Sequence, residues 1–559
     1  MSTRWRAAIG LAALAIAMGA SARAVTWTRA VTAHFEVFTT DGARTATAVA
    51  SELEGIQRFF DTFMALPPFT GLRTQVVVFG NRDEYRPYRT SAGSAAYYQP
   101  ATDRDFIVIG HYDADSTAIL THEYAHAALQ RSGASYPTWL SEGLAEFLST
   151  VEWQRDVGVI GAPPPSRLAA LTNASLIPIR RLVEVTHASP EYTTEHTGVF
   201  YAESWALTHM LVAGERYQPR VDGFLRATAT GSPTAEALTT VFGTTLEQLD
   251  SELRQYISRG FFRRLRVPYP RAESAPAPTA TPVASLDAEL VLAQVLAAGS
   301  GRDTATRAAF DALLRDHPDE PRVEAARGRF ELQSGNRDAA RDWLERAVAH
   351  RTTDAMAWSE LAQLTGHDNR PRTETLHQTA VQLAPDHIGI RLRYAAFLVG
   401  SGQLDNARRT LAGVRPLRRA DQFLYHQITT NLFAATNDFD EAAREGRAVV
   451  AAADTASERA FAQTFLRGVS GPADLTRTAT GRLRDIDCSG PLMVLSIDTN
   501  PGRLRLQLDQ PRRLAVGGGG TVDLTCGPQD RAVRVGYAHE QPPDGLDGRL
   551  RLIDFRERR

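Results

Sequence analysis

Two histidines four residues apart have the residue type and the spacing needed to bind a metal ion. Residues 121–126 read Thr-His-Glu-Tyr-Ala-His, so His122, Glu123 and His126 form an H-E-x-x-H pattern. On a helix, positions i and i+4 share one face, so both imidazoles can contact one ion. Glu123 is displaced by one residue, where its carboxylate can reach a water on that metal. The pattern predicts a zinc site; the alternative is an ordinary helix with two exposed histidines.

A second block supplies the ligand that two histidines lack. Residues 137–147 read Pro-Thr-Trp-Leu-Ser-Glu-Gly-Leu-Ala-Glu-Phe, with Glu142 and Glu146 four residues apart. A catalytic zinc uses three protein ligands and keeps one open position for water. Glu142 can be the third ligand, and Glu146 can accept the free N–H of a ligating histidine. The alternative is a solvated helix face, which the flanking Trp, Leu and Phe residues disfavour.

Together, H-E-x-x-H and the following W-L-x-E-G-x-A block resemble the gluzincin metallopeptidases. The second block is similar to the aminopeptidase N type, and the whole most resembles the bacterial peptidase-MA-like domains that precede tetratricopeptide repeats. The resemblance covers roughly residues 25–265 and is specific over 117–150. It implies an α+β zincin-like fold and hydrolysis of peptide bonds in a peptide or protein substrate, with Zn²⁺ as cofactor.

Residue by residue, the resemblance implies that His122, His126 and Glu142 are the zinc ligands. It makes Glu123 the general base and Glu146 the acid that orients the first histidine. The gap between His126 and Glu142 is shorter than in aminopeptidase N-type or thermolysin-like enzymes, and the G-x-M-E-N element that holds a free amine is absent. Aminopeptidase specificity is therefore not implied, and the choice between endo- and exopeptidase stays open.

The resemblance also suggests how the cleft treats the substrate. It implies that the strand at 105–110 is an edge strand that pairs with an extended substrate. Tyr201 is the candidate donor to the oxyanion, since aminopeptidase N-type enzymes carry a tyrosine at a comparable distance. Tyr192 and His196 are alternatives, and Tyr201 as a plain core residue is equally compatible. His209 shows no ligand spacing and is expected on the surface or in the core.

The elements that must position these residues follow from apolar periodicity. Alternating or continuous apolar runs predict strands at 34–39, 74–79 and 105–110, and helical spacing predicts a helix over 44–64. The pattern from 116 to 257 is mostly helical. Strands first and helices after predict an α+β domain over residues 25–265.

A change of composition follows that domain. Residues 266–285 are rich in Pro, Ala and Thr without apolar periodicity, which predicts a semi-rigid linker with separately folding units on either side. Beyond it, related segments begin at Gly335, Gly402 and Asn437, at offsets that fit two periods and one period of about 34 residues. Residues 286–470 therefore resemble tetratricopeptide repeats, whose concave face could dock a protein partner; the alternative is a generic Ala-rich bundle.

The carboxyl-terminal part has a different pattern. Short alternating runs separated by Gly, Pro and Asp predict a small β domain over residues 475–559, similar to a sandwich or barrel. Its residues Cys488 and Cys526 are the only cysteines of the chain. They could pair in an oxidising compartment.

The amino terminus resembles an export signal. Arg4 and Arg6 precede an apolar run that ends in alternating small residues at 20–24, which predicts a signal peptide over residues 1–24. The alternative, an uncleaved anchor, is disfavoured because the run is shorter than the ~20 residues that span a bilayer. The mature chain is expected in the periplasm or secreted, without a stable membrane anchor.

Composition narrows the remaining classes. The chain of 559 residues has 62 basic and 64 acidic residues, for a net charge of −2, and every basic residue is arginine. This balance gives no overall field for nucleic acid, and the lack of lysine excludes Schiff-base chemistry and a P-loop. The sequence predicts an exported, multidomain zinc metallopeptidase. The alternative is a binding scaffold that uses its repeats and carries a vestigial or structural metal site.

Overall fold

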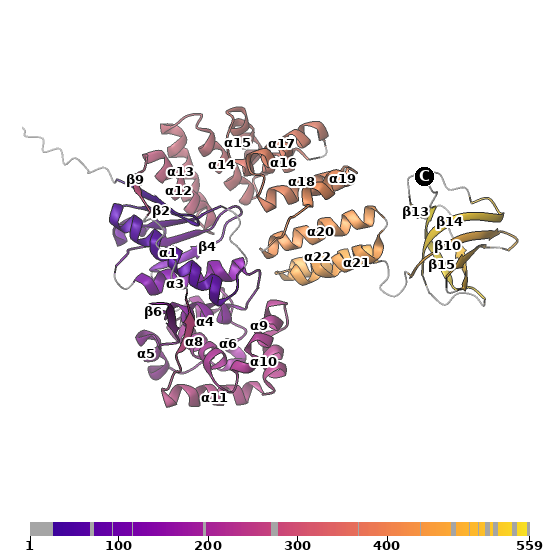
Figure 1. Ribbon diagram of the computed structural model, residues 1–559. Helices are drawn as coiled ribbons and strands as arrows, with labels where there is room; N and C mark the ends of the chain where they lie inside the picture. Colours follow the sequence, from indigo (N-terminus) through magenta and orange to yellow (C-terminus); the bar gives the residue numbers. More distant parts are fainter. Residues whose placement is uncertain are drawn as a thin grey trace, which may run out of the picture.

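The structure is a computed structural model. It describes residues 26–66, 72–91, 93–113, 116–193, 197–269, 278–366, 368–416, 418–436, 438–470, 477–490, 492–500, 502–508, 515–517, 524–538 and 545–555. The predicted signal peptide, residues 1–24, lies outside the described residues. Within these ranges, the helices lack the combination of length and apolar character needed to cross a membrane. Figure 1 shows mixed sheet and helices first, then a stack of helices, then a small sheet unit.

The first sheet has six strands in the order β4-β5-β3-β2-β1-β9. The central strands β2 (Phe35–Thr39), β3 (Thr74–Val78) and β5 (Phe106–Ile109) are parallel to one another. All residues of β3 and β5 are buried, as expected for parallel strands covered on both faces. The outer strands, antiparallel to their neighbours, are β1 (Thr28–Val31), β4 (Ala96–Gln99) and β9 (Ala280–Pro282).

Two helices cover the faces of this sheet. Helix α1 (Ala43–Phe63), predicted over 44–64, packs its apolar stripe against the face that includes Val76 and Ile107. Side chains alternate along a strand, so Val77 and Val108 point to the opposite face. That face is covered by α12 (Ser285–Ala298), whose Val291 and Val295 pack against it.

The predicted linker, residues 266–285, needs correction at both ends. Strand β8 (Leu265–Pro268) joins β6 (Glu152–Gln154) and β7 (Val157–Ile160) in a three-stranded sheet, and β9 adds to the first sheet. The helix that follows then covers the first sheet. The units on either side are therefore packed together, which differs from the expected separate folding.

The predicted metal-binding residues lie on two helices at the junction of two lobes. We call residues 26–113 with β9 the sheet lobe and residues 138–259 the helical lobe. Helix α3 (Ser116–Arg131) lies between them and contacts α1 and β4 on one side and α4 (Thr138–Ser149) on the other. The other helices of the helical lobe are α5 (Pro165–Asn173), α6 (Ile179–Leu182), α7 (Pro190–Thr193), α8 (Thr197–Ala213), η1 (Gln218–Arg220), α9 (Val221–Ala229), α10 (Thr234–Phe242) and α11 (Leu246–Arg259).

A glycine in the second motif lets α4 approach α8 closely. A Cβ on Gly143 would lie 2.1 Å from Thr208 Oγ1 and 2.4 Å from the carbonyl oxygen of Ser204. Only glycine fits such an approach without displacing one helix. The neighbouring Glu142 is thereby fixed against a buried helix.

The edge strand beside the cleft is not the one expected. The predicted edge strand, residues 105–110, corresponds to β5, which is flanked by β3 and β4. Strand β4, which ends the sheet on that side, follows a helical turn, α2 (Arg82–Tyr85). The short sequence Ala-Tyr-Tyr-Gln of β4 carries little apolar periodicity, which explains why it was missed.

Residues 286–470 form antiparallel helix pairs, as expected for repeats. Gly335 and Gly402 take similar positive φ values in equivalent turns, 82° and 75°. Ala340, Ala407 and Ala442, at equivalent positions after these turns, are fully buried where helices meet. The helices are α13 (Asp303–Asp316), α14 (Pro321–Gln333), α15 (Arg337–Ala349), α16 (Ala355–Thr365), α17 (Arg370–Leu383), α18 (Ile388–Gly400), α19 (Leu404–Leu411), α20 (Arg419–Ala435), α21 (Phe439–Ala452) and α22 (Ala456–Ser470).

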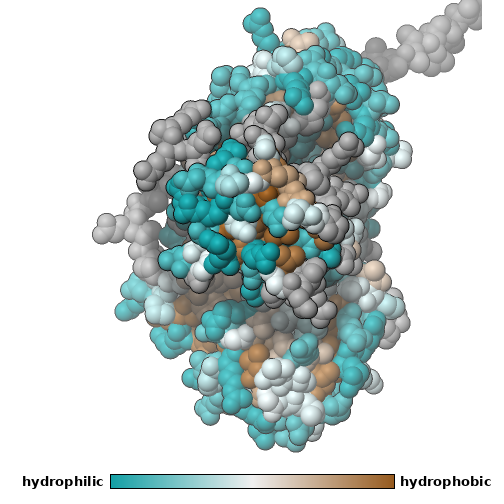
Figure 2. Space-filling view, turned by 90° about the vertical axis from the view of Figure 1, so that its right-hand side faces the viewer, coloured by the Kyte–Doolittle hydropathy of each residue, from teal (hydrophilic) through white to brown (hydrophobic). Residues whose placement is uncertain are grey.

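The carboxyl-terminal unit is a β domain, as predicted for 475–559. Its sheet runs β12-β11-β10-β14-β15-β13, and an additional β12–β15 pairing joins the row into a closed structure. Cys488 and Cys526 form a disulfide. Figure 2 shows the molecule from the side of this domain, with mostly hydrophilic residues and small, separate hydrophobic patches. The strands are β10 (Arg477–Asp487), β11 (Met493–Thr499), β12 (Gly502–Leu508), β13 (Ala515–Gly517), β14 (Gly527–Ala538) and β15 (Gly548–Phe555).

Candidate metal centre

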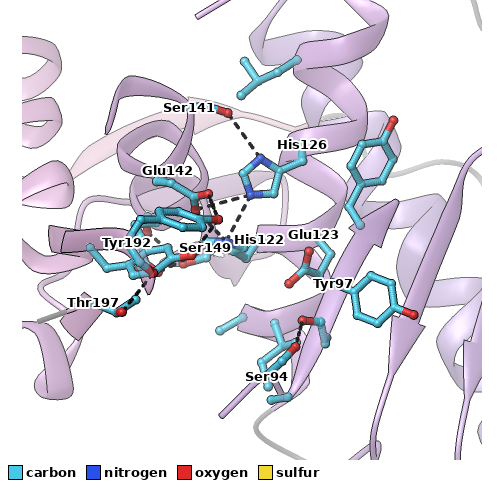
Figure 3. A pocket seen from close by; sticks show the side chains of 18 of the residues that line it. Ser94, Tyr97, His122, Glu123, His126, Ser141, Glu142, Ser149, Tyr192 and Thr197 are labelled. Carbon is cyan, nitrogen blue, oxygen red and sulfur yellow. Dashed lines mark hydrogen bonds and ion pairs between the residues drawn. The ribbon is translucent and has the colours of Figure 1, made fainter. Parts of the chain in front are cut away.

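His122, His126 and Glu142, which we call the cleft cluster, converge from α3 and α4. The two histidine Nε2 atoms are 3.3 Å apart. They lie 3.5 and 3.6 Å from Glu142 Oε2, respectively. Figure 3 shows both rings directed at the Glu142 carboxylate. The three residues predicted as ligands are therefore brought together by the fold.

The cleft cluster fits the donor geometry of zinc. Neighbouring donors in a tetrahedron with bonds of roughly 2.0–2.1 Å are about 3.3–3.4 Å apart, close to the three distances of the cluster. Glu142 Oε2 is buried and has no hydrogen-bond partner among the described residues. A buried carboxylate oxygen left in this way is costly unless a cation or donor satisfies it. Two imidazoles and a carboxylate are also the donor set that catalytic zinc prefers.

The electrostatics of the cluster favour a cation. Burial alone would lower the pKa of His122, but the contact with Glu142 and the charges of Glu123 and Glu146 raise it to about 9. Burial opposes ionisation of Glu142, yet the two histidines outweigh it and hold its pKa well below the usual range. The carboxylates thus create a negative field at the histidine nitrogens, and the same field attracts a divalent ion.

Glu123 lies next to the cluster without joining it. Its side chain is 9% exposed and lines the same cavity as both histidines. Burial raises the pKa of Glu123 against the opposing charges of His122 and His126. In Figure 3, Glu123 and Tyr192 lie on opposite sides of the cluster. A carboxylate with a raised pKa beside a cation site suits proton transfer.

Glu146 lies behind His122, and an arginine holds it there. Its Oε1 is 3.5 Å from His122 Nδ1. Arg167 on α5 donates to both oxygens of Glu146, at 2.9 and 2.7 Å. The Arg167 guanidinium also lies over the ring of Tyr201, with 5.0 Å to the centroid. Arg167 was not predicted as a site residue, because nothing in its local sequence marks it as part of the site.

Tyr192 and Tyr201 both reach the cluster, but through different contacts. The Tyr192 hydroxyl donates to Glu142 Oε1 at 3.2 Å, and the Tyr201 hydroxyl donates to that of Tyr192 at 3.4 Å. Burial and the charge of Glu142 raise the pKa of both tyrosines well above the usual range, so both remain donors. His196 lies outside the described residues. Tyr192, an alternative in the sequence analysis, is therefore nearer to the ligand than Tyr201.

Two further histidine contacts bear on the predictions: one at His126, in the cluster, and one at His209, in the core. Ser141, inside the second motif, lies with its Oγ 3.4 Å from His126 Nδ1 and was also missed. His209 is fully buried between Tyr256 and the Gly161 carbonyl, at 2.6 and 2.9 Å. Its position in the core agrees with the expectation that it is not a ligand.

The cleft cluster faces a cavity of about 1770 Å³. Pockets for small molecules occupy roughly 300–1,000 Å³, so this cavity is large enough for a longer ligand. Its walls come from β4 and its flanks, from α3 and α4, from the segment around Arg167 and from the start of α8. Arg419 and Asp454, from the helical repeats, also line it.

A second group of ligand types lies in the repeats. Asp319, Glu324 and His350, which we call the repeat cluster, also have their donor atoms within 4.8 Å of one another. Here Arg346 pairs with Asp319 at 3.3 Å and with Glu324 at 2.8 Å, and His350 Nδ1 lies 2.7 Å from Glu324. The arginine already supplies the positive charge that the carboxylates require.

Comparisons with known proteins identify the repeats. Residues 371–432 match the tetratricopeptide repeat family. A comparison with curated proteins gives no match. Among solved structures, the chain superposes on a thermophilic tetratricopeptide protein of Thermus thermophilus with a TM-score of 0.26 and 18% identity, covering 33% of this chain and 99% of that one. The pilus biogenesis factor PilW gives 0.29 and 12%, over 34% and 87% of the two chains. YrrB, a tetratricopeptide protein with an unusual peptide-binding site, gives 0.25 and 14%, over 32% and 90%.

The family match confirms the tetratricopeptide character of residues 371–432, within the predicted region 286–470. The matched residues span α17 to α20 and so include the turn at Gly402. Tetratricopeptide helices stack into surfaces that bind proteins. The match concerns this region and leaves the cleft cluster to be judged from its own geometry.

Proposed function

We propose that this chain is an exported zinc-dependent peptidase that carries a tetratricopeptide region. The observation that carries the proposal is the triangle of His122 Nε2, His126 Nε2 and Glu142 Oε2, with sides of 3.3, 3.5 and 3.6 Å. Its position in a large cavity beside Glu123 adds support. Export rests on the signal-like sequence of residues 1–24.

Each residue then has a defined role. Zinc held by the cleft cluster would polarise the scissile carbonyl and lower the pKa of a bound water to about 7. Glu123 would accept the proton of the attacking water and pass it to the leaving amine. Tyr192 or Tyr201 would donate to the developing oxyanion. Glu146, fixed by Arg167, would keep His122 in the required orientation.

The sheet offers a way to hold the peptide. Strand β4 ends the first sheet, and residues 94–100, which contain it, line the cavity. An extended substrate could pair with its free edge through main-chain hydrogen bonds. Such pairing does not depend on substrate side chains, so it is compatible with a range of peptide sequences.

A second candidate function is a protein-binding scaffold, and the family match at residues 371–432 favours it directly. In that case the repeats dock a protein partner and the cleft cluster is structural or vestigial. The buried Glu123 argues for catalysis, because metal binding alone does not require it. The two candidates share the same repeats and differ in what the cleft does.

The experiment compares two substitutions that separate metal binding from catalysis. Glu123→Gln should retain about one zinc per chain and lose roughly 10²–10⁴-fold in hydrolysis of a mixed peptide library. Glu142→Ala should lose both zinc and hydrolysis, because two histidines alone hold zinc poorly. Zinc is measured by elemental analysis and hydrolysis by mass spectrometry of the products.

A matched control is Glu331→Gln, a buried glutamate of the repeats that pairs with Arg307 and Arg327. It should leave both zinc content and hydrolysis unchanged. Wild-type protein that binds zinc but cleaves no peptide would favour the scaffold. Equal loss of zinc in Glu123→Gln and Glu142→Ala would contradict the assigned roles.

A further inference from the structure

Arginines of the repeats bind the turn that follows edge strand β4. Arg329 on α14 forms a two-point ion pair with Asp103, at 2.9 and 3.0 Å, and the two side chains are 10% and 9% exposed. Arg418, just before α20, donates to Asp105 at 2.8 Å and to the carbonyl of Ala101 at 3.0 Å. Two arginines from the repeats therefore hold the turn that leads out of the cleft-lining strand.

The neighbouring residue, Arg419, reaches the other lobe. Its Nη1 donates to the carbonyl of Ala229 at 2.8 Å, where α9 ends in the helical lobe. Its Nε pairs with Asp454 at 2.9 Å, and the Arg419 side chain is 11% exposed. In Figure 1 the ends of α20 and α22 reach the region between β4 above and α9 below. Adjacent residues of one segment thus bind the sheet lobe and the helical lobe.

The same segment forms part of the cavity wall. Arg419 and Asp454 line the cavity that holds the cleft cluster. In the sequence, both residues lie roughly 300 residues after Glu123. The repeats therefore contribute part of the wall of the cleft. A ligand bound in the cleft lies next to the repeats.

We propose that Arg418 and Arg419 form a brace that fixes the separation of the two lobes, so that the cleft admits extended, unfolded polypeptide and excludes folded proteins. The substrate part of this inference rests on the proposed peptidase function. The brace itself does not.

The two arginines restrict how far the lobes can move. A guanidinium binds its acceptors in a fixed planar geometry, and removing one partner of a buried ion pair leaves an uncompensated charge. Lobes on either side of a cleft commonly move by hinge rotation, and a link anchored on both lobes opposes that motion. The brace therefore favours one cleft width over others.

Size determines the substrate class. A cavity of about 1770 Å³ can hold several residues of extended chain. A folded domain of 100 residues has a radius of gyration of about 13 Å, so it occupies a far larger volume. With the lobes braced and the repeats along one side, the cavity admits a segment of extended chain, whereas a folded domain is too large to enter it.

The first test measures lobe separation and requires no activity. Ser51→Cys on α1 and Ser251→Cys on α11 place exposed thiols on the sheet lobe and the helical lobe. The native cysteines are bonded to each other, so spin labels attach only to these two positions. Double electron–electron resonance on the full-length chain then reports the distribution of lobe separations.

Arg419→Met keeps the length of the side chain and removes its charge and donors. We expect about a tenfold larger population of open separations, which corresponds to about 1.4 kcal/mol. Arg418→Met should give a smaller shift in the same direction, because Arg329 still pairs with Asp103 in the same turn. This second variant tests the brace if Arg419→Met folds poorly. The control is Arg408→Met, an exposed arginine of α19 that pairs with Asp405 on its own helix. Distributions equal to this control in both variants would overturn the brace.

The second test compares hydrolysis of one protein in its native form and in its reduced, alkylated and unfolded form. Wild type should cleave only the unfolded form. In Arg419→Met, the ratio of the hydrolysis rate of the unfolded form to that of the native form should be about tenfold smaller than in Arg408→Met. An unchanged ratio would overturn the substrate class. Failure of wild type to cleave either form would count against the peptidase, while the distance measurement still decides the brace.

Discussion

The cleft cluster combines two histidines with one carboxylate, and the repeat cluster combines one histidine with two carboxylates. In each cluster the donor atoms lie within 4.8 Å of one another. In the repeat cluster, Arg346 pairs with both carboxylates and His350 with one of them. In the cleft cluster, both histidine Nε2 atoms face Glu142 Oε2, and Arg167, which lines the same cavity, pairs with Glu146 instead. The two clusters therefore share their ligand types and differ in whether an arginine already neutralises their carboxylates.

A third buried glutamate extends the comparison. Glu203 on α8 accepts a hydrogen bond from the backbone N–H of Ile177 at 2.6 Å. Burial raises its pKa to about 8, against that hydrogen bond and the charge of Arg254. These buried carboxylates are thus stabilised in three ways: histidines contact Glu142, an arginine pairs with Glu324, and a backbone amide donates to Glu203. Each predicts a different response to substitution.

The largest expected effect is loss of the metal. His126→Ala should reduce zinc from about one per chain to near zero, because a ligand is removed from a three-ligand site. His350→Ala, the equivalent change in the repeat cluster, should leave the zinc content unchanged. Elemental analysis after dialysis measures both. Equal zinc loss in the two variants would remove the distinction between the clusters.

The next effect concerns the arginine behind the cleft cluster. Arg167→Ala should weaken zinc binding by about 10–100-fold, because Glu146 loses the partner that fixes it behind His122. Guanidinium ion at low millimolar concentration should restore part of the affinity, since Arg167 lines the open cavity. Competition with a chromophoric chelator measures the affinity. No change on substitution would mean that Glu146 is positioned without Arg167.

A stability effect is expected at the repeat cluster. Arg346→Met should lower the free energy of unfolding by about 1–3 kcal/mol, because buried Glu324 loses a hydrogen-bond donor. Arg372→Met, which removes an exposed arginine paired with Glu345, should cost much less. Urea unfolding followed by circular dichroism compares them. A smaller loss for Arg346→Met than for its control would show that His350 alone satisfies Glu324.

A pH dependence of stability is expected from Glu203. Its pKa is higher in the folded than in the unfolded chain, so the folded state binds more protons between about pH 4.5 and 8. Stability from this group is therefore greatest at low pH and falls by up to about 1.4 kcal/mol per pH unit as pH rises through this window. Glu203→Gln should remove that slope in thermal unfolding at pH 5, 6, 7 and 8. Parallel slopes for the two proteins would contradict the assignment.

The sequence located the cleft cluster because spacing on helices is a local property. His122 and His126 follow from a period of 3.6 residues, and Glu142 follows from the motif around it. Arg167 and Tyr192 come from other helices, and only the tertiary fold brings them to Glu146 and Glu142. A single sequence carries no local signal for such contacts.

The fold was predictable where periodicity is strong. Strands β2, β3 and β5 and helix α1 lie where apolar spacing puts them, and the repeats follow from self-similarity. Strand β4 is short and half polar, and β9 lies in a Pro- and Thr-rich stretch, so neither gives a pattern. The predicted linker failed for the same reason: composition describes a segment in isolation, and the pairing partner β1 is about 250 residues away.

The packing of α12 on the first sheet constrains how the chain is made. One face of that sheet, including Val77 and Val108, is covered by Val291 and Val295. During synthesis from the amino terminus, these strands form before the helix that covers them has been translated. Until residues beyond 298 have emerged from the ribosome, this apolar face is either exposed to solvent or covered by other molecules. A chain that terminates at residue 265 would keep this face open and would be prone to association through it.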